Sequence, residues 1–192
     1  MTQEIILSLQ GEKVGLGPLH RDLLPLIDCW FNDPEVMLPY FSGDLTPETP
    51  EDSAQRYERL RKEVSFAIYQ LDSLRPIGLI QLMGVDHFNR IAALGMLIGE
   101  KECWNRGYGT EAASLALDWG FNGLGLHNIG LTVFRFNQRA IAAYRKVGFR
   151  ESGRRREAKR VGGQVDDVIF MDILASEFSG PSRLPRPAAP PK

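Results

Sequence analysis

Hydrophobic spacing in the first third of the chain predicts one short strand followed by two helices. Apolar positions alternate with glycine over 14–18, which is typical of a strand. Leu23, Leu26, Ile27 and Trp30 then recur at helical spacing. This helix is expected to end at 32–34, because the residue before a proline is disfavoured in a helix. A loop over 39–50 and a polar helix over 51–62 are expected next.

From residue 64 onward the pattern predicts a β meander, followed by alternating helices and strands. The meander strands are expected over 64–70, 76–85 and 91–98. A helix over 107–122 is apolar on nearly all sides, so we expect it to lie buried against a sheet. Further strands are expected over 127–134, 149–156 and 166–174, with a helix over 137–147. The order β-α-α-β-β-β-α-β-α-β-β indicates an α+β fold around a mixed sheet.

Length and composition indicate one domain with a short tail. The chain has 192 residues, of which 43% are apolar, enough for one hydrophobic core within residues 1–178. Residues 179–192 hold five prolines and few large apolar side chains. Such a composition is typical of a disordered tail, with a polyproline ligand as the alternative interpretation.

Charge and cysteine content narrow the class of protein. The net charge of −1 gives no reason to expect a nucleic-acid or membrane partner. Two cysteines, Cys29 and Cys103, form neither a disulfide framework nor a metal-ligand pattern, so we expect free thiols and no metal. The N-terminus lacks a signal-peptide pattern, and no apolar run approaches the length of a membrane span. A cytoplasmic location is expected.

The most informative motif lies between the third meander strand and the buried helix. Trp104-Asn105-Arg106-Gly107-Tyr108-Gly109-Thr110 places two glycines before a helix start, where backbone N–H groups can bind a phosphate. A P-loop is excluded because no Gly-Lys-Ser/Thr follows, and Ala112 breaks the dinucleotide-binding pattern. On this motif alone, a tight strand-to-helix turn without any ligand remains an equal alternative.

A second motif follows 28 residues later, running from Asn137 to Phe149 in the pattern N-x-x-A-x-x-x-Y-x-x-x-G-F. Asn137 suits a helix N-cap and Gly148 suits a helix end, which explains both structurally. Tyr144 shares a helix face with Ile141, so its hydroxyl needs a partner if that face is buried. A core role for Tyr144 is the alternative.

Together these motifs resemble the GNAT acetyltransferases, in their RimJ/RimL-like branch, over about residues 11–174. The resemblance implies a mostly antiparallel sheet with one splayed strand pair and flanking helices. It implies an N-acetyltransferase that uses acetyl-CoA as co-substrate and moves the acetyl group directly to a primary amine. Small-molecule amines, antibiotics and protein N-termini are the candidate acceptors, and a homodimer is a further expectation.

The resemblance also assigns roles to residues. Tyr144 is carried over as the general acid that protonates the leaving thiolate. The strand at 96–98, splayed from the strand at 131–133, is expected to pair with the pantetheine arm, and Asn137 to contact that arm. The expected cofactor-binding residues are Met96, Leu97, Ile98, Trp104, Asn105, Arg106, Gly107, Tyr108, Gly109, Thr110 and Asn137.

The general base is the weakest part of this interpretation. Many relatives have a glutamate on the third meander strand, where this chain has Ala93. Asp86, Glu100, His87 and a water relay remain candidates. Cys103 has no histidine motif to activate it and is interpreted as a small buried apolar residue.

Acceptor-binding residues are expected in the loop after the first helix, in the second helix and in the hairpin turn. These are Tyr40, Phe41, Asp44, Glu48, Glu51, Asp52 and residues 86–88, whose acidic and aromatic groups suit a cationic amine. An exposed polar loop without ligand is the alternative. Two rival functions are an acyl-CoA-binding regulatory protein without turnover, which Ala93 favours, and a transferase that uses a longer acyl donor.

Overall fold

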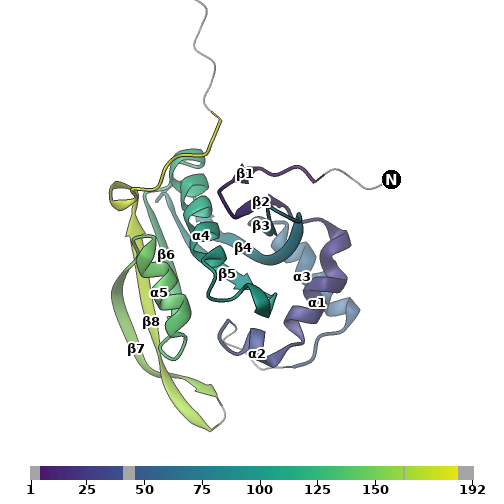
Figure 1. Ribbon diagram of the computed structural model, residues 1–192. Helices are drawn as coiled ribbons and strands as arrows, with labels where there is room; N and C mark the ends of the chain where they lie inside the picture. Colours follow the sequence, from purple (N-terminus) through teal and green to yellow (C-terminus); the bar gives the residue numbers. More distant parts are fainter. Residues whose placement is uncertain (1–4, 41–45, 162, 186–192) are drawn as a thin grey trace, which may run out of the picture.

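A computed structural model describes residues 5–40, 46–161 and 163–185. They form an eight-stranded sheet flanked by helices (Figure 1). The elements in chain order are β1 (Leu9–Gln10), β2 (Val14–Pro18), α1 (Leu24–Phe31), α2 (Pro34–Met37), α3 (Pro50–Leu60), β3 (Val64–Gln70), β4 (Arg75–Asp86), β5 (Ile91–Ile98), α4 (Tyr108–Asp118), β6 (Asn128–Phe134), α5 (Gln138–Lys146), β7 (Arg150–Val161) and β8 (Gln164–Leu174). Short helical turns lie at Arg21–Leu23, Lys101–Cys103, Trp119–Gly123 and Ala175–Glu177. The α+β prediction is confirmed.

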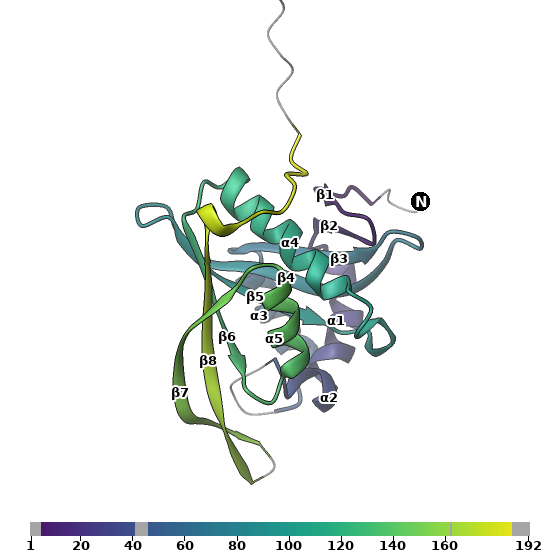
Figure 2. The same ribbon diagram turned by 60° about the vertical axis from the view of Figure 1, so that its left-hand side comes forward.

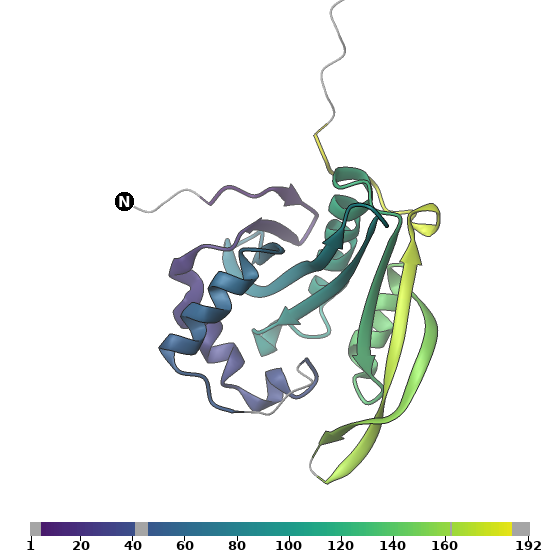
Figure 3. The same ribbon diagram turned by 180° about the vertical axis from the view of Figure 1, so that it is seen from behind.

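The sheet is antiparallel except at one place, where β5 lies parallel to β6. The strand order is β1-β2-β3-β4-β5-β6-β8-β7. The parallel pairing covers only three residue pairs and ends at Ala93 and Gly130. Beyond that point the two strands diverge, as Figure 3 shows from behind. The splayed strand pair expected from the resemblance is therefore present.

Helices cover the two faces of the sheet unequally. Figure 2 shows α4 and α5 side by side on one face, whereas α1, α2 and α3 lie on the other face, beside β2–β5. Because side chains alternate along a strand, β3 sends Ile68 to the core under α4 and Tyr69 to the core under α1 and α3. Both residues are at most 2% exposed. The part of the sheet formed by β2–β5 is therefore covered by helices on both faces.

One carboxylate joins the first turn of α4 to the β1–β2 turn. Glu111 accepts backbone hydrogen bonds from Glu12, Lys13 and Val14 at 2.6, 2.8 and 2.9 Å. Gly11 is needed beside it, because a Cβ there would lie 2.5 Å from the Glu111 Oε1 atom. The start of α4 is thus tied to the turn between the first two strands of the sheet.

Several elements differ from the sequence-based expectation. The strand β1 was not expected, and the helix α2 begins where only a helix end was expected. The Asp33 side chain accepts a hydrogen bond from the Glu35 backbone N–H, so the segment that ends α1 also caps α2. The β7–β8 hairpin extends to Val161 and Gln164, beyond the predicted 156 and 166.

The end of the described chain lies against α4. The Arg183 backbone N–H donates to the Asp118 carboxylate at 2.6 Å, and Leu184 packs on the core beneath. These residues belong to the segment expected as a tail, whose last part, 186–192, lies outside the described residues. Among the described helices none has the length and apolar character that a bilayer crossing requires.

Candidate active site

A cavity of about 840 Å³ opens where β5 and β6 diverge. The splayed strands, the start of α4, one face of α5 and the loop after α2 all contribute side chains to its wall. Of the residues expected to bind a cofactor, all but one line it: Met96, Leu97, Ile98, Trp104, Asn105, Gly107, Tyr108, Gly109, Thr110 and Asn137. Tyr144 lines it as well.

The loop before α4 presents backbone donors to this cavity. Asn105 and Gly107 both adopt positive φ, 60° and 86°, and this turns the chain sharply into the helix. Gly107 is the N-cap of α4, and no side chain caps the first turn. Within the described residues no side chain accepts from the N–H groups of this turn, which lies at the cavity wall near the positive end of the helix dipole, an arrangement suited to an anion.

A lysine from a distant part of the chain lies beside this loop. Arg106 does not line the cavity, and its side chain is exposed. Instead Lys13, from the β1–β2 turn, donates from Nζ to the Arg106 carbonyl at 3.2 Å. A neighbouring hollow of about 580 Å³ is lined by Lys13, Arg145 and Lys146 and shares Gly107 with the main cavity. These three cations lie near the start of α4, together with the carboxylates of Glu12 and Glu111.

An arginine from α5, Arg139, stacks on the Trp104 ring at the cavity wall. The Arg139 guanidinium lies 3.7 Å from the centre of the Trp104 ring, and both side chains line the cavity. Trp104 also donates from Nε1 to the Ile98 carbonyl at 2.8 Å. Burial lowers the pKa of Arg139, although its guanidinium stays charged near neutral pH.

Tyr144 is held rigidly with its hydroxyl at the cavity wall. The residue is 6% exposed, and its ring packs edge-on against Phe149 at 5.6 Å. None of the described residues forms a hydrogen bond with its hydroxyl. Burial raises the pKa of Tyr144, and the nearby Tyr40 adds a smaller effect in the same direction. The phenol is therefore a stable proton donor that lacks a protein partner in the described part of the chain.

Asn137 connects α5 to the loop after α2. Its Oδ1 accepts from the Ala140 backbone N–H at 3.1 Å, which is the expected N-cap bond. Its Nδ2 donates to the Pro39 carbonyl at 3.2 Å, across the cavity mouth. The next residue, Tyr40, also lines the cavity, where burial raises its pKa and a hydrogen bond with Gln81 opposes that rise.

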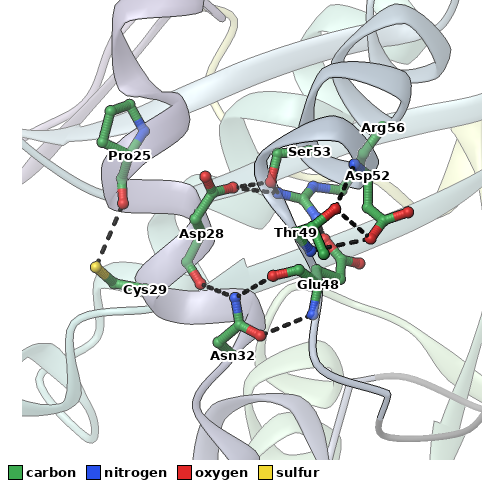
Figure 4. Close-up of polar contacts among 9 residues, drawn as sticks. All are labelled: Pro25, Asp28, Cys29, Asn32, Glu48, Thr49, Asp52, Ser53 and Arg56. Carbon is green, nitrogen blue, oxygen red and sulfur yellow. Dashed lines mark hydrogen bonds and ion pairs between the residues drawn. The ribbon is translucent and has the colours of Figure 1, made fainter.

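A charge network of Asp28, Glu48 and Arg56 joins α1 to α3 and to the segment before α3 (Figure 4), and its Arg56 lines the cavity. Arg56 is 4% exposed and stacks 3.9 Å from the centre of the Phe31 ring. It donates to Asp28 at 2.9 Å and forms an ion pair with Glu48. Since two carboxylates surround one guanidinium, the group carries a net negative charge when all three residues are ionised.

Most residues expected to bind an acceptor have structural partners. Glu48 pairs with Arg56, and Asp52 completes a capping box with Thr49 at the start of α3. Asp86 accepts from the Phe88 and Asn89 backbone N–H groups of its own turn. Glu51, exposed in the first turn of α3, is not among the cavity residues. Phe41 and Asp44 lie outside the described residues.

The candidates for a base also lie elsewhere. Glu100 binds the Trp30 indole at 2.8 Å and forms an ion pair with Arg75, and neither Asp86 nor His87 lines the cavity. Cys103 is 5% exposed, and burial raises the pKa of its thiol, in keeping with an unreactive residue. Within the described residues no group of three or more His, Cys, Asp or Glu side chains is arranged to hold a metal ion.

Sequence reasoning missed several ionisable residues around the cavity and the neighbouring hollow, among them Lys13, Glu63 and Arg139, and also Arg56, Arg59 and Lys146. Lys13 and Glu63 come from turns whose position depends on distant pairing, so no local signal marks them. Arg139 lies within the second motif, and its spacing from Trp104 gives no sign of the stacking.

Comparison with known proteins agrees with this geometry. The family model described as an acetyltransferase (GNAT) domain matches residues 13–150. Spermidine N(1)-acetyltransferase of Escherichia coli K12 is 33% identical over 176 residues, which are 91% of this chain and 93% of that protein. The structure of spermidine N-acetyltransferase from Vibrio cholerae in complex with CoA and spermine aligns with a TM-score of 0.79 at 27% identity, covering 87% of this chain and 98% of that one. A GNAT-family acetyltransferase from Bacillus anthracis shares the fold, with a TM-score of 0.76 at 21% identity.

Proposed function

Because the chain belongs to the acetyltransferase (GNAT) family, whose model matches residues 13–150, we propose that it transfers the acetyl group of acetyl-CoA to a primary amine of an aliphatic polyamine. The coarser activity, an acetyl-CoA-dependent N-acetyltransferase, follows from the family and its relatives. The acceptor class and the residue roles are our proposal. The observation that carries it is the cavity in which an uncapped helix start and the Tyr144 hydroxyl meet.

The cavity has the features that acetyl-CoA requires. The first-turn N–H groups of α4 would bind the pyrophosphate, and Lys13 and Lys146 would supply positive charge. The edge of β5 that faces β6 is unpaired after Ala93, so its backbone is available to an extended arm. Bound acetyl-CoA supplies an activated acyl group as a thioester.

Tyr144 fits the role of the acid that protonates the thiolate as it leaves. Tyr144 lines the cavity, no described residue binds its hydroxyl, and its raised pKa keeps it protonated at neutral pH. Positioned proton transfer contributes about 10²- to 10⁴-fold in rate. We therefore expect Tyr144→Phe to lower kcat by at least about 10²-fold and to leave acetyl-CoA affinity nearly unchanged, measured by CoA release and by calorimetry. An unchanged kcat would remove Tyr144 from the mechanism.

Charge supports a cationic acceptor. Glu63 is the one carboxylate among the described residues that line the cavity, and a cationic acceptor could contact it there. Asp28 and Glu48 are paired with Arg56 and do not line the cavity. The E. coli and V. cholerae relatives named above are spermidine acetyltransferases. We also retain as proposals the RimJ/RimL-like placement, a cytoplasmic location and a homodimer, the last testable by light scattering.

The test is a CoA-release assay on the purified protein with acetyl-CoA and a panel of polyamines, aminoglycosides and N-terminal peptides. We expect turnover with spermidine or spermine, and a product heavier by one acetyl group. Turnover with peptides or aminoglycosides alone would overturn the polyamine proposal and keep the transferase. Saturable acetyl-CoA binding without turnover on any amine would favour the regulatory alternative, for which Ala93 is the supporting observation.

A further inference from the structure

A carboxylate lies in the same cross-strand row as Ala93. The β4–β5 register places Met83 directly opposite Ala93, and the β3–β4 register places Val64 opposite Leu82. Extending the second register by one residue sets Glu63 opposite Met83. Directly opposite residues of a sheet point to the same face, so Glu63, Met83 and Ala93 share one face. Glu63 is two strands from Ala93, about 10 Å away.

The Glu63 side chain is oriented by the backbone of β4. Its Oε2 accepts from the Gly84 N–H at 2.8 Å. Gly84 has a φ of 58° at the point where the β4–β5 register shifts between Met83 and Asp86, so a bulge turns this donor toward Glu63. No described residue bonds the second carboxylate oxygen. One oxygen is thus fixed, and the other is available to a ligand.

Glu63 belongs to the cavity wall together with Tyr40, Gln81 and Tyr144. Among the described residues that line this cavity, it is the single carboxylate. Asp86, His87 and Glu100 do not line the cavity. Asp86 accepts a hydrogen bond from the Asn89 backbone N–H, and Glu100 accepts one from the Trp30 indole. The described wall of this cavity therefore holds both an acidic side chain, Glu63, and the proton donor of α5, Tyr144.

We propose that Glu63 is the general base of this enzyme, taking the place of the glutamate that Ala93 lacks. This inference rests on the proposed function. An aliphatic ammonium, with a pKa near 10.4, must lose a proton before its nitrogen can attack. That proton passes to Glu63 directly or through one water. The nitrogen then bonds to the thioester carbonyl carbon, the carbon–sulfur bond breaks with its electron pair on sulfur, and the thiolate takes a proton from Tyr144. The second amine proton leaves to solvent.

The experiment compares wild type, Glu63→Gln and the control Glu58→Gln with a polyamine and with a monoamine. Glutamine retains an oxygen for the Gly84 N–H, so the fold is preserved, which circular dichroism checks. Glu58 lies on exposed α3 surface paired with Arg61, and its change removes the same charge outside the cavity. For Glu63→Gln we expect kcat to fall by about 10²-fold or more with both amines near pH 7.

The pH profile and a rescue variant separate a base from a positioning group. The deficit of Glu63→Gln is expected to narrow as pH rises toward 10, because more of the amine is already deprotonated in solution. Adding Ala93→Glu to Glu63→Gln should restore at least about tenfold in kcat. A deficit confined to the KM of polyamines and absent with the monoamine would overturn the inference, since a group that only binds a second ammonium behaves so. Equal activity of all variants would overturn it and leave the proposed function standing, whereas an inactive wild type would overturn both.

Discussion

Replacing Glu111 by alanine should destabilise the protein strongly, although this residue lies outside its main cores. The carboxylate accepts three backbone N–H bonds of 2.6–2.9 Å from the β1–β2 turn. The Glu12 and Lys13 donors are exposed and can bond to water after truncation, so each should cost about 1 kcal/mol. Val14 is 0% exposed, and an unsatisfied donor there costs about 1–3 kcal/mol. The expected loss is about 3–5 kcal/mol.

Urea unfolding followed by circular dichroism measures this loss, and a thermal scan provides a second measure. At about 2–4 °C per kcal/mol for a chain of this size, Tm should fall by roughly 6–20 °C. The control is Glu12→Ala, which removes a carboxylate from the same turn but no side-chain hydrogen bond among the described residues. A Glu111→Ala loss below about 1 kcal/mol, or equal to that of the control, would refute the reasoning, because the turn would then be held by the sheet alone.

Three further predictions concern Tyr144, Gly107 and Thr49. Because burial raises the pKa of Tyr144, its acid form should persist through pH 10, so a wild-type kcat that falls with an alkaline midpoint well below 10 would contradict its assignment. Gly107→Ala places a side chain at a φ of 86°, so it should cost about 1 kcal/mol of stability and should also weaken acetyl-CoA binding, measured by calorimetry. Gly163→Ala is the control: it is also at positive φ but far from the cavity, so it should affect stability alone. Thr49→Ala removes the cap of α3 and should cost about 1 kcal/mol at pH 7 in urea unfolding. The Thr49 backbone N–H and, to a smaller extent, its hydroxyl lower the pKa of Asp52 in the folded state. Alanine keeps the backbone bond and removes the hydroxyl bond. The part of the difference that comes from the hydroxyl bond is present above the carboxyl's unfolded pKa and is lost as pH falls through the lower folded value, so a Thr49→Ala difference that does not shrink in acid would count against it.

Local signals in the sequence accounted for most elements but not for their exact extent. Asn137 caps α5 and Gly107 begins α4, as their residue types indicate, because caps and sharp turns depend on neighbours within a few residues. The strand β1 has only two residues, too few for any alternation. The segment 32–34 contains both the end of α1 and the cap of α2, and a pattern-based reading recognised only the first.

The residues of the candidate site that belong to contiguous motifs could be predicted from the sequence. Those brought to the site by strand pairing or by other long-range contacts were missed. The loop 104–110 and Tyr144 come from continuous motifs, and nearly all of these residues line one cavity. Glu63 reaches the same wall only because β3, β4 and β5 adopt a particular register, with a bulge at Gly84. Lys13 likewise depends on the bond between Glu111 and a turn nearly a hundred residues earlier in the chain. Such long-range placements leave no local signal.

The three-residue contact between β5 and β6 divides the sheet into two hydrogen-bonded blocks, β1–β5 and β6–β8. Few backbone bonds join them, so each block can exchange its amide hydrogens as a separate cooperative unit. A ligand whose extended arm pairs with β5 while its other groups contact α5 adds backbone bonds where the ladder is missing. Part of the free energy of ligand binding then stabilises the contact between the two blocks, so that they open less independently. Amide protection should consequently rise in both blocks when acetyl-CoA binds, including in strands that the ligand never touches.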